Sequence, residues 1–121
     1  IPLAEDPEFF DNMDEILDVE GLGGVQLGPS DLALGLGIKE TYNFDNPQVK
    51  SRFERLFKKA KEKGIPLMGP IAPPNLERAI EMAENGVRVM TLRNDVTNFK
   101  MLLAGLRKDV YIPLKKHFET V

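Results

Sequence analysis

The strongest constraint on the fold is a pattern that occurs four times along the chain: a short apolar segment, a turn, and then a stretch with helical periodicity. The apolar segments contain β-branched residues, which favour strands. Strands that alternate with amphipathic helices pair in parallel through right-handed crossovers. We therefore expect an α/β protein in which all four strands point the same way.

Turn and capping residues set the expected boundaries. The strands are expected at residues 1–5, 24–27, 65–68 and 87–92. Helices are expected to begin at Asp6-Pro7 and Asn46-Pro47, because a side-chain cap followed by proline marks a helix N-terminus. The first helix is expected to end near Asp18 and the second at Gly64, since glycine is common after a helix. The third is expected to end at Gly86.

The fourth helix is expected to begin at Asn94 or Asp95. In the tail that follows, residues 109–121, Pro113 is expected to break the helical pattern, and Leu114 with Phe118 indicates one more amphipathic helix. Apolar residues at helical spacing are expected to face the core. They are Phe9, Phe10, Met13, Ile16, Leu17, Val49, Phe53, Leu56, Phe57, Ala60, Leu76, Ala79, Ile80, Ala83, Val96, Phe99, Leu102, Leu103 and Leu106.

Composition narrows the class of protein. A chain of 121 residues is long enough for one unit, residues 1–121, and too short for two. The net charge of −3 argues against nucleic-acid and membrane partners, and the absence of cysteine is compatible with a cytoplasmic protein. The chain begins at Ile1 inside an apolar run, from which we expect a piece of a longer polypeptide.

Four such units make half of a (β/α)8 barrel or a small open sheet, and in both architectures the segments after the strands carry the chemistry. The segment between Gly28 and Asp45 is expected to be a long loop. Two carboxylates, Glu5 and Asp31, follow neighbouring strands and suit a divalent cation held by oxygen ligands. The alternative is that both cap helices, Asp31 starting a short helix through Leu34.

Other kinds of active site have less support. No lysine lies at an expected strand end, which argues against a Schiff-base mechanism of the usual barrel type. The single histidine, His117, lies in the tail, away from the strand ends, so a Ser-His-Asp triad is not expected. We therefore assign no catalytic acid or base to this chain.

The residues around the two carboxylates resemble a known family. The segment 25–32, Val-Gln-Leu-Gly-Pro-Ser-Asp-Leu, is similar to the GPxDL signature of the HpcH/HpaI aldolase and citrate lyase family. Glu5 lies 26 residues before Asp31, as the acidic strand end of that family does. Later segments, such as Lys63-Gly64-Ile65-Pro66 and Asn94-Asp95-Val96, resemble its last two βα units.

The resemblance implies the C-terminal half of a (β/α)8 TIM barrel, with four parallel βα units and a C-terminal helix. It implies that Glu5 and Asp31 ligate Mg²⁺, Mn²⁺ or Co²⁺. The backbone N–H groups of Ser30 and Asp31 would receive the carboxylate of a pyruvate-like 2-oxo acid, in a site that includes Gly28 and Pro29. The implied activity is a class II aldolase, a carbon–carbon lyase that cleaves a 4-hydroxy-2-oxo acid to pyruvate and an aldehyde.

The resemblance also sets expectations for partners. The histidine base and an arginine of the family come from the N-terminal half, so the chain is expected to pair with such a half or to form a homo-oligomer. Arg93 is a possible residue of the pocket rim, and Leu3 stands where many members have glutamine. Two alternatives stay open: a citrate-lyase-like acyl-thioester lyase, and a non-catalytic half-barrel that associates with itself.

Overall fold

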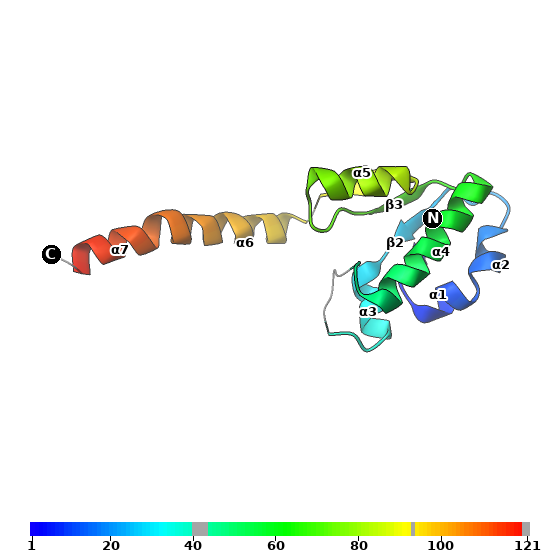
Figure 1. Ribbon diagram of the computed structural model, residues 1–121, viewed down its shortest axis with the longest axis horizontal. Coiled ribbons are helices and arrows are strands. Elements are labelled where there is room, and N and C mark those ends of the chain that lie inside the picture. The colour runs from blue at the N-terminus through cyan, green and yellow to red at the C-terminus, as the bar shows by residue number, and fades with distance from the viewer. Residues whose placement is uncertain (40–43, 93, 120–121) are drawn as a thin grey trace.

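The computed structural model describes residues 1–39, 44–92 and 94–119. A parallel sheet with the strand order β1-β2-β3-β4 lies at its centre (Figure 1). This confirms the predicted α/β class and the common direction of the strands. The strands are β1 (Leu3–Ala4), β2 (Val25–Leu27), β3 (Leu67–Pro70) and β4 (Val87–Thr91).

Helices follow each of the strands. No helix among the described residues is both long and apolar enough to cross a membrane. The helices are α1 (Pro7–Asp11), α2 (Met13–Leu17), α3 (Pro29–Gly35), α4 (Pro47–Lys63), α5 (Leu76–Glu84), α6 (Asp95–Leu106), the π-helical turn η1 (Arg107–Tyr111) and α7 (Ile112–Glu119).

Three of the predicted helix caps are present. The Asp6 carboxylate accepts a hydrogen bond from the Phe9 N–H at 2.7 Å, at the start of α1. The Asn46 side chain accepts from the backbone at the start of α4, and Asn94 does the same for α6. Each cap satisfies an N–H group that has no partner inside its helix, and a cap of this kind contributes about 1 kcal/mol.

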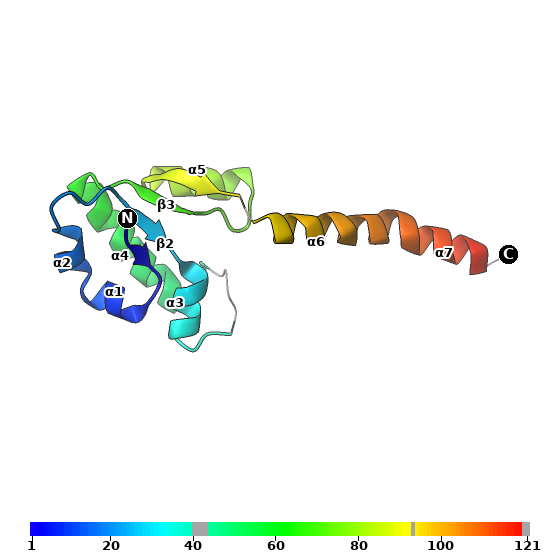
Figure 2. The ribbon, with the colours of Figure 1, turned by 180° about the vertical axis from the view of Figure 1, so that it is seen from behind.

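Helices from the described part of the chain cover only one face of the sheet (Figures 1 and 2). Figure 1 shows α4 and α5 in front of the strands, and Figure 2 shows β1 and β2 in front of α4. The opposite face, called the open face below, carries a row of residues in mutual register, in which Leu3 is 42% exposed and Val89 55% exposed. Parallel sheets are normally covered on both faces. The row is Leu3, Gln26, Met68 and Val89.

Helix α4 supplies the largest part of the covered core. Its predicted apolar stripe is confirmed, because every member is buried. Phe53 lies at the centre of an aromatic cluster and meets Phe10 edge to face, with ring centroids 5.4 Å apart. The stripe consists of Val49, Phe53, Leu56, Phe57 and Ala60.

Polar contacts align α4 with the first two helices. The Arg55 guanidinium donates to the Phe10 carbonyl at 3.0 Å. One and two turns further along α4, Lys59 pairs with Asp14 and Lys63 pairs with Asp18. Partners in all three contacts are 45 residues apart in sequence. The constant separation means that α4 runs beside α1 and α2 in one register.

Two predicted boundaries are wrong near the N-terminal half of the sheet. The segment from Gly28 to Asp45 is not a continuous loop, because α3 occupies its first part. The alternative of a short helix here is correct, but its capping residues are wrong: Gly28 and not Asp31 is the N-cap of α3, and Asp6 and not Glu5 caps α1. The helix after β1 is interrupted at Asn12, whose side chain donates to the Glu8 carbonyl at 3.0 Å. Asparagine competes in this way with the hydrogen bonds of the helix backbone.

In α5 the predicted buried face is partly wrong. Leu76 and Ile80 are 76% and 50% exposed, whereas Met82 is buried. The spacing of small and large apolar residues allows either face of this helix to point inward, and packing against β4 and α4 selects the face of Met82.

The last helical segment differs most from the expectation. Residues 95–119 form one continuous helical rod that extends away from the sheet, and none of its residues is buried (Figures 1 and 2). Pro113 does not break it: the rod continues through the π-helical turn η1, which ends directly before α7, and past Pro113. The residues wrongly predicted to face the core are Val96, Phe99, Leu102, Leu103 and Leu106.

A pair of leucine variants tests the core. Leu56 is fully buried on α4 and Leu34 is 60% exposed on α3. Leu56→Ala is expected to lower the free energy of unfolding by about 2–5 kcal/mol, because it leaves a cavity. Leu34→Ala is expected to change it by less than about 0.5 kcal/mol. Urea denaturation followed by circular dichroism measures both, and equal losses would contradict the assigned core.

Candidate functional site

The carboxyl ends of β1 and β2 approach each other closely at Glu5 and Gly28. The Gly28 N–H donates to the Ala4 carbonyl at 3.0 Å. A Cβ atom added to Gly28 would lie 2.4 Å from the Glu5 Cβ and 3.2 Å from its carboxylate Oε2. Only glycine fits at this position, and its missing side chain leaves room for the Glu5 carboxylate at the edge of the sheet.

Helix α3 begins directly after this contact. Gly28 is its N-cap and offers no side chain to accept a hydrogen bond, and Pro29 is its first residue. The N–H groups of Ser30 and Asp31, in the first turn, therefore lack a capping acceptor and carry the positive end of the helix dipole. Asp31 is exposed in this turn, at the same sheet edge as Glu5.

Close packing fixes the position of α3. A Cβ atom on Gly35, at the end of this helix, would lie 3.1 Å from Cδ of Pro7 at the start of α1. Pro29, Leu32 and Ala33 bury their side chains. The helix that follows β2 and the helix that follows β1 therefore hold each other in place around Glu5.

The Ser30 hydroxyl is a polar group without a partner. Its Oγ atom is buried and makes no hydrogen bond within the described part of the chain. Buried hydroxyl groups are nearly always satisfied, and an orphan one costs about 1–3 kcal/mol. A hydroxyl in this state, one residue from Asp31, suggests a bound ligand or water.

Two carboxylates, those of Glu5 and Asp31, are the possible metal ligands at this edge of the sheet. Within residues 1–39, 44–92 and 94–119 no group of three or more His, Cys, Asp or Glu side chains is placed to hold a metal ion. Glu5 and Asp31 alone would leave most positions around a cation to water and ligand, as hard divalent ions such as Mg²⁺ tolerate. The oxygen donors and the orphan Ser30 hydroxyl fit such an ion.

A pocket of about 450 Å³ opens at the same edge, after β3 and β4. Its wall is mostly apolar and carries three polar side chains, Thr91, Asn94 and Thr97. Sequence reasoning did not assign Thr91 and Thr97 to a site, although Thr91 lies at the end of the predicted strand 87–92 and Thr97 follows it closely. The apolar part of the wall is formed by Pro70, Ile71, Ala72 and Pro74.

Two other residues considered from sequence lie elsewhere. Arg93 falls outside the described residues. His117 lies on α7, far along the rod from the sheet edge, and its ring contacts Phe118 at a centroid distance of 5.4 Å (Figure 1).

Comparison with known proteins assigns the chain to a family. The sequence profile described as HpcH/HpaI aldolase/citrate lyase matches residues 5–102, which include both carboxylates and α3. The chain belongs to the HpcH/HpaI aldolase/citrate lyase family. This confirms the resemblance carried by the GPxDL segment.

Relatives of the chain are named aldolases. It is 36% identical over 90 residues to a 5-keto-4-deoxy-D-glucarate aldolase from Escherichia fergusonii. The aligned residues make up 74% of this chain and 34% of the relative. It is 40% identical over 61 residues to a 2-keto-3-deoxy-L-rhamnonate aldolase from Escherichia coli O1:K1, covering 50% and 22%. The chain thus spans about a third or less of the length of these curated relatives.

Solved structures share the fold. An HpcH/HpaI aldolase from Desulfitobacterium hafniense DCB-2 matches with a TM-score of 0.75 and 25% identity, over 89% of this chain and 40% of that one. A macrophomate synthase matches with a TM-score of 0.82 and 19% identity, over 96% and 39%, and shows the fold alone. The four βα units therefore share the fold of about two fifths of each of these structures.

A glycine pair tests the contact between β1 and β2. Gly28→Ala is expected to lower the free energy of unfolding by about 1–3 kcal/mol, because the new methyl group overlaps Glu5. Gly23→Ala is the control, since a Cβ atom there has no neighbour within 4 Å. Chemical denaturation measures both variants, and a Gly28→Ala protein as stable as Gly23→Ala would refute the close approach.

Proposed function

We propose that the chain is part of a metal-dependent, class II aldolase that cleaves a 4-hydroxy-2-oxo acid to pyruvate and an aldehyde. The observation that carries the proposal is the position of Glu5 over the side-chain-free Gly28, beside the uncapped first turn of α3. Membership of the aldolase family and the names of the relatives support it.

In this proposal Glu5 and Asp31 hold a divalent cation, Mg²⁺, Mn²⁺ or Co²⁺. Carboxylate oxygens favour these hard ions but separate them poorly. A bound ion supplies Lewis-acid polarisation of the 2-oxo group, which favours the electron-rich product of carbon–carbon cleavage. The role of Gly28 is to let the Glu5 carboxylate and a small ligand share the narrow space at the sheet edge.

The first turn of α3 receives the substrate carboxylate. The N–H groups of Ser30 and Asp31 point out of an uncapped helix end, where the helix dipole favours an anion. Pro29 has no N–H group of its own. Its presence costs the helix no hydrogen bond, because the first N–H groups of a helix have no partner inside it. The substrate is thereby oriented with its carboxylate toward α3 and its 2-oxo group toward Glu5.

The remaining part of the substrate extends toward the pocket after β3 and β4. The strand order places β2 between β1, which carries Glu5, and β3, which leads into the pocket. A base that accepts the proton of the 4-hydroxyl group is not assigned to this chain. In the proposal it comes from the further βα units that close the barrel over the open face.

Neutral variants of the two carboxylates test the metal site. Glu5→Gln and Asp31→Asn are each expected to weaken Mn²⁺ binding at least tenfold, because each removes a charged oxygen ligand. Glu8→Gln is the control, since Glu8 is exposed on α1. Titration calorimetry measures the affinity, and pyruvate release from a 4-hydroxy-2-oxo acid measures the reaction. Unchanged Mn²⁺ affinity in both variants would refute the metal site.

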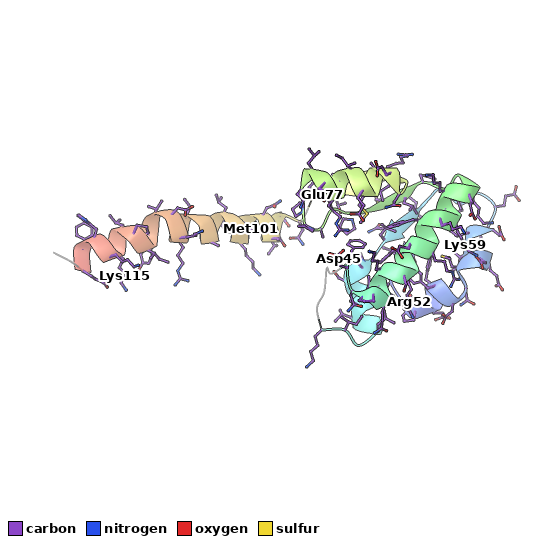
Figure 3. All side chains as sticks on the ribbon, in the orientation of Figure 1. Asp45, Arg52, Lys59, Glu77, Met101 and Lys115 are labelled. Carbon is purple, nitrogen blue, oxygen red and sulfur yellow. The ribbon has the colours of Figure 1, made fainter. Side chains whose placement is uncertain are left out.

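We further propose that the rod of residues 95–119 packs against a second copy of the chain. Its apolar residues are exposed on several sides, and Figure 3 shows the Met101 and Lys115 side chains on a part of the rod that no other element approaches. The rod leads away from its own sheet, so it reaches apolar surface only on another molecule. Leu76 and Ile80, both exposed on α5, offer such a surface on the body of each copy.

A substitution on the rod tests this assembly. Leu102→Lys is expected to lower the mass measured by size-exclusion chromatography with light scattering, because a charge would be buried in the contact. Asn98→Lys, an exposed polar position on the same helix, serves as the control and is expected to leave the mass unchanged. A wild-type protein that is monomeric throughout the micromolar range would contradict the proposal.

A further inference from the structure

The open face carries one polar side chain in its register row. Gln26, in the middle of β2, is paired with Leu3 of β1 on one side and with Met68 of β3 on the other. Met68 is in turn paired with Val89 of β4. The amide of Gln26 therefore lies in a row whose other members are apolar.

The direction of this side chain follows from the alternation along β2. Val25 and Leu27 are buried on the face covered by helices, so Gln26 projects from the open face. Gly28 lies two residues after Gln26, and a Cβ atom added to Gly28 would contact the Cβ atom of Glu5. Side chains two residues apart on a strand lie on the same face. Gln26 is thus one level below the site of Glu5 and Gly28.

No hydrogen bond from another described residue holds the Gln26 amide in place. Its side chain makes no hydrogen bond within residues 1–39, 44–92 and 94–119, and the residue is half-buried. An amide that is partly removed from water without a partner does not stabilise a protein. An apolar residue at this position would match its neighbours Leu3 and Met68 better.

The surroundings of Gln26 point to a ligand. Strand β2 lies between the carboxylate of Glu5 and the pocket that Pro70 and Thr91 line. A substrate that extends from Glu5 into this pocket crosses β2 at Gly28. Because Gly28 has no side chain, the next side chain below it on the same face is that of Gln26. The side-chain amide both donates and accepts hydrogen bonds, so it suits a hydroxyl group.

We infer that Gln26 is a specificity-determining residue, whose amide binds a hydroxyl group on the aldehyde-derived part of the substrate and so favours hydroxylated over apolar aldehydes. This inference rests on the proposed aldolase function and adds the class of aldehyde to it. A site built to bind a hydroxyl group rejects an analogue that lacks it, because its own polar group then stays unpaired.

The test uses the complete protein that carries this chain, assayed with Mn²⁺ in the direction of addition. Pyruvate is combined either with glyceraldehyde or with propanal, which lacks the further hydroxyl groups, and kcat/KM is measured for each. In Gln26→Met the ratio of glyceraldehyde to propanal is expected to fall about tenfold, as the loss of one hydrogen bond in a site predicts. Gln48→Met, on the exposed first turn of α4, is expected to keep the wild-type ratio.

A stability measurement separates this role from a structural one. Gln26→Met is expected to unfold at the same temperature as the wild type or at a higher one, because no hydrogen bond to another described residue is lost and the row becomes uniformly apolar. An unchanged ratio in an active Gln26→Met enzyme overturns the assignment of Gln26 alone. Equal losses with both aldehydes, together with a lower unfolding temperature, do the same. A wild-type protein that joins pyruvate to neither aldehyde overturns the aldolase proposal itself.

Discussion

The burial of one face of α4 is the interaction on which the rest of the described structure depends. This helix packs against α2 and α3 and contributes Phe53 to the aromatic cluster with Phe10. Each large apolar side chain that it buries contributes about 1.5–3 kcal/mol. Through α1 and α3, which flank the ends of β1 and β2, the same packing fixes the backbone at Glu5 and Gly28. The site is therefore as rigid as the core behind it.

The parts of the fold that follow from local patterns were predictable from sequence. The stripe on α4 has clear helical periodicity, and Asp6 and Asn46 stand at positions where a cap and a proline coincide. Helical periodicity indicates that one face of a helix is apolar, but it does not indicate which other element covers that face. For this reason Phe99 and Leu102, on a helix without a neighbour among the described residues, were wrongly placed in the core.

From the sequence, the candidate site could be predicted as a pair of carboxylates at one edge of the sheet, but not in its detailed geometry. The rule that parallel strands end at one edge indicates Glu5 and Asp31 from the sequence alone. The close contact of Gly28 with Glu5 and the unsatisfied Ser30 hydroxyl were not predictable, because they depend on how neighbouring backbones approach each other. The position of Gln26 between Leu3 and Met68 could not be predicted for the same reason. It depends on the register of three strands, which no local sequence pattern encodes.

The strand order has a consequence for the order of folding during synthesis. Each strand pairs with the strand that precedes it in the chain, so every new βα unit finds its docking surface already present when it leaves the ribosome. These pairings join residues 20 to 42 positions apart, so each needs only the unit directly before it in the chain. The rod that begins at Asp95 is different, since its apolar side chains have no earlier segment of the described chain to bind. Its apolar side chains therefore stay exposed after the sheet has formed.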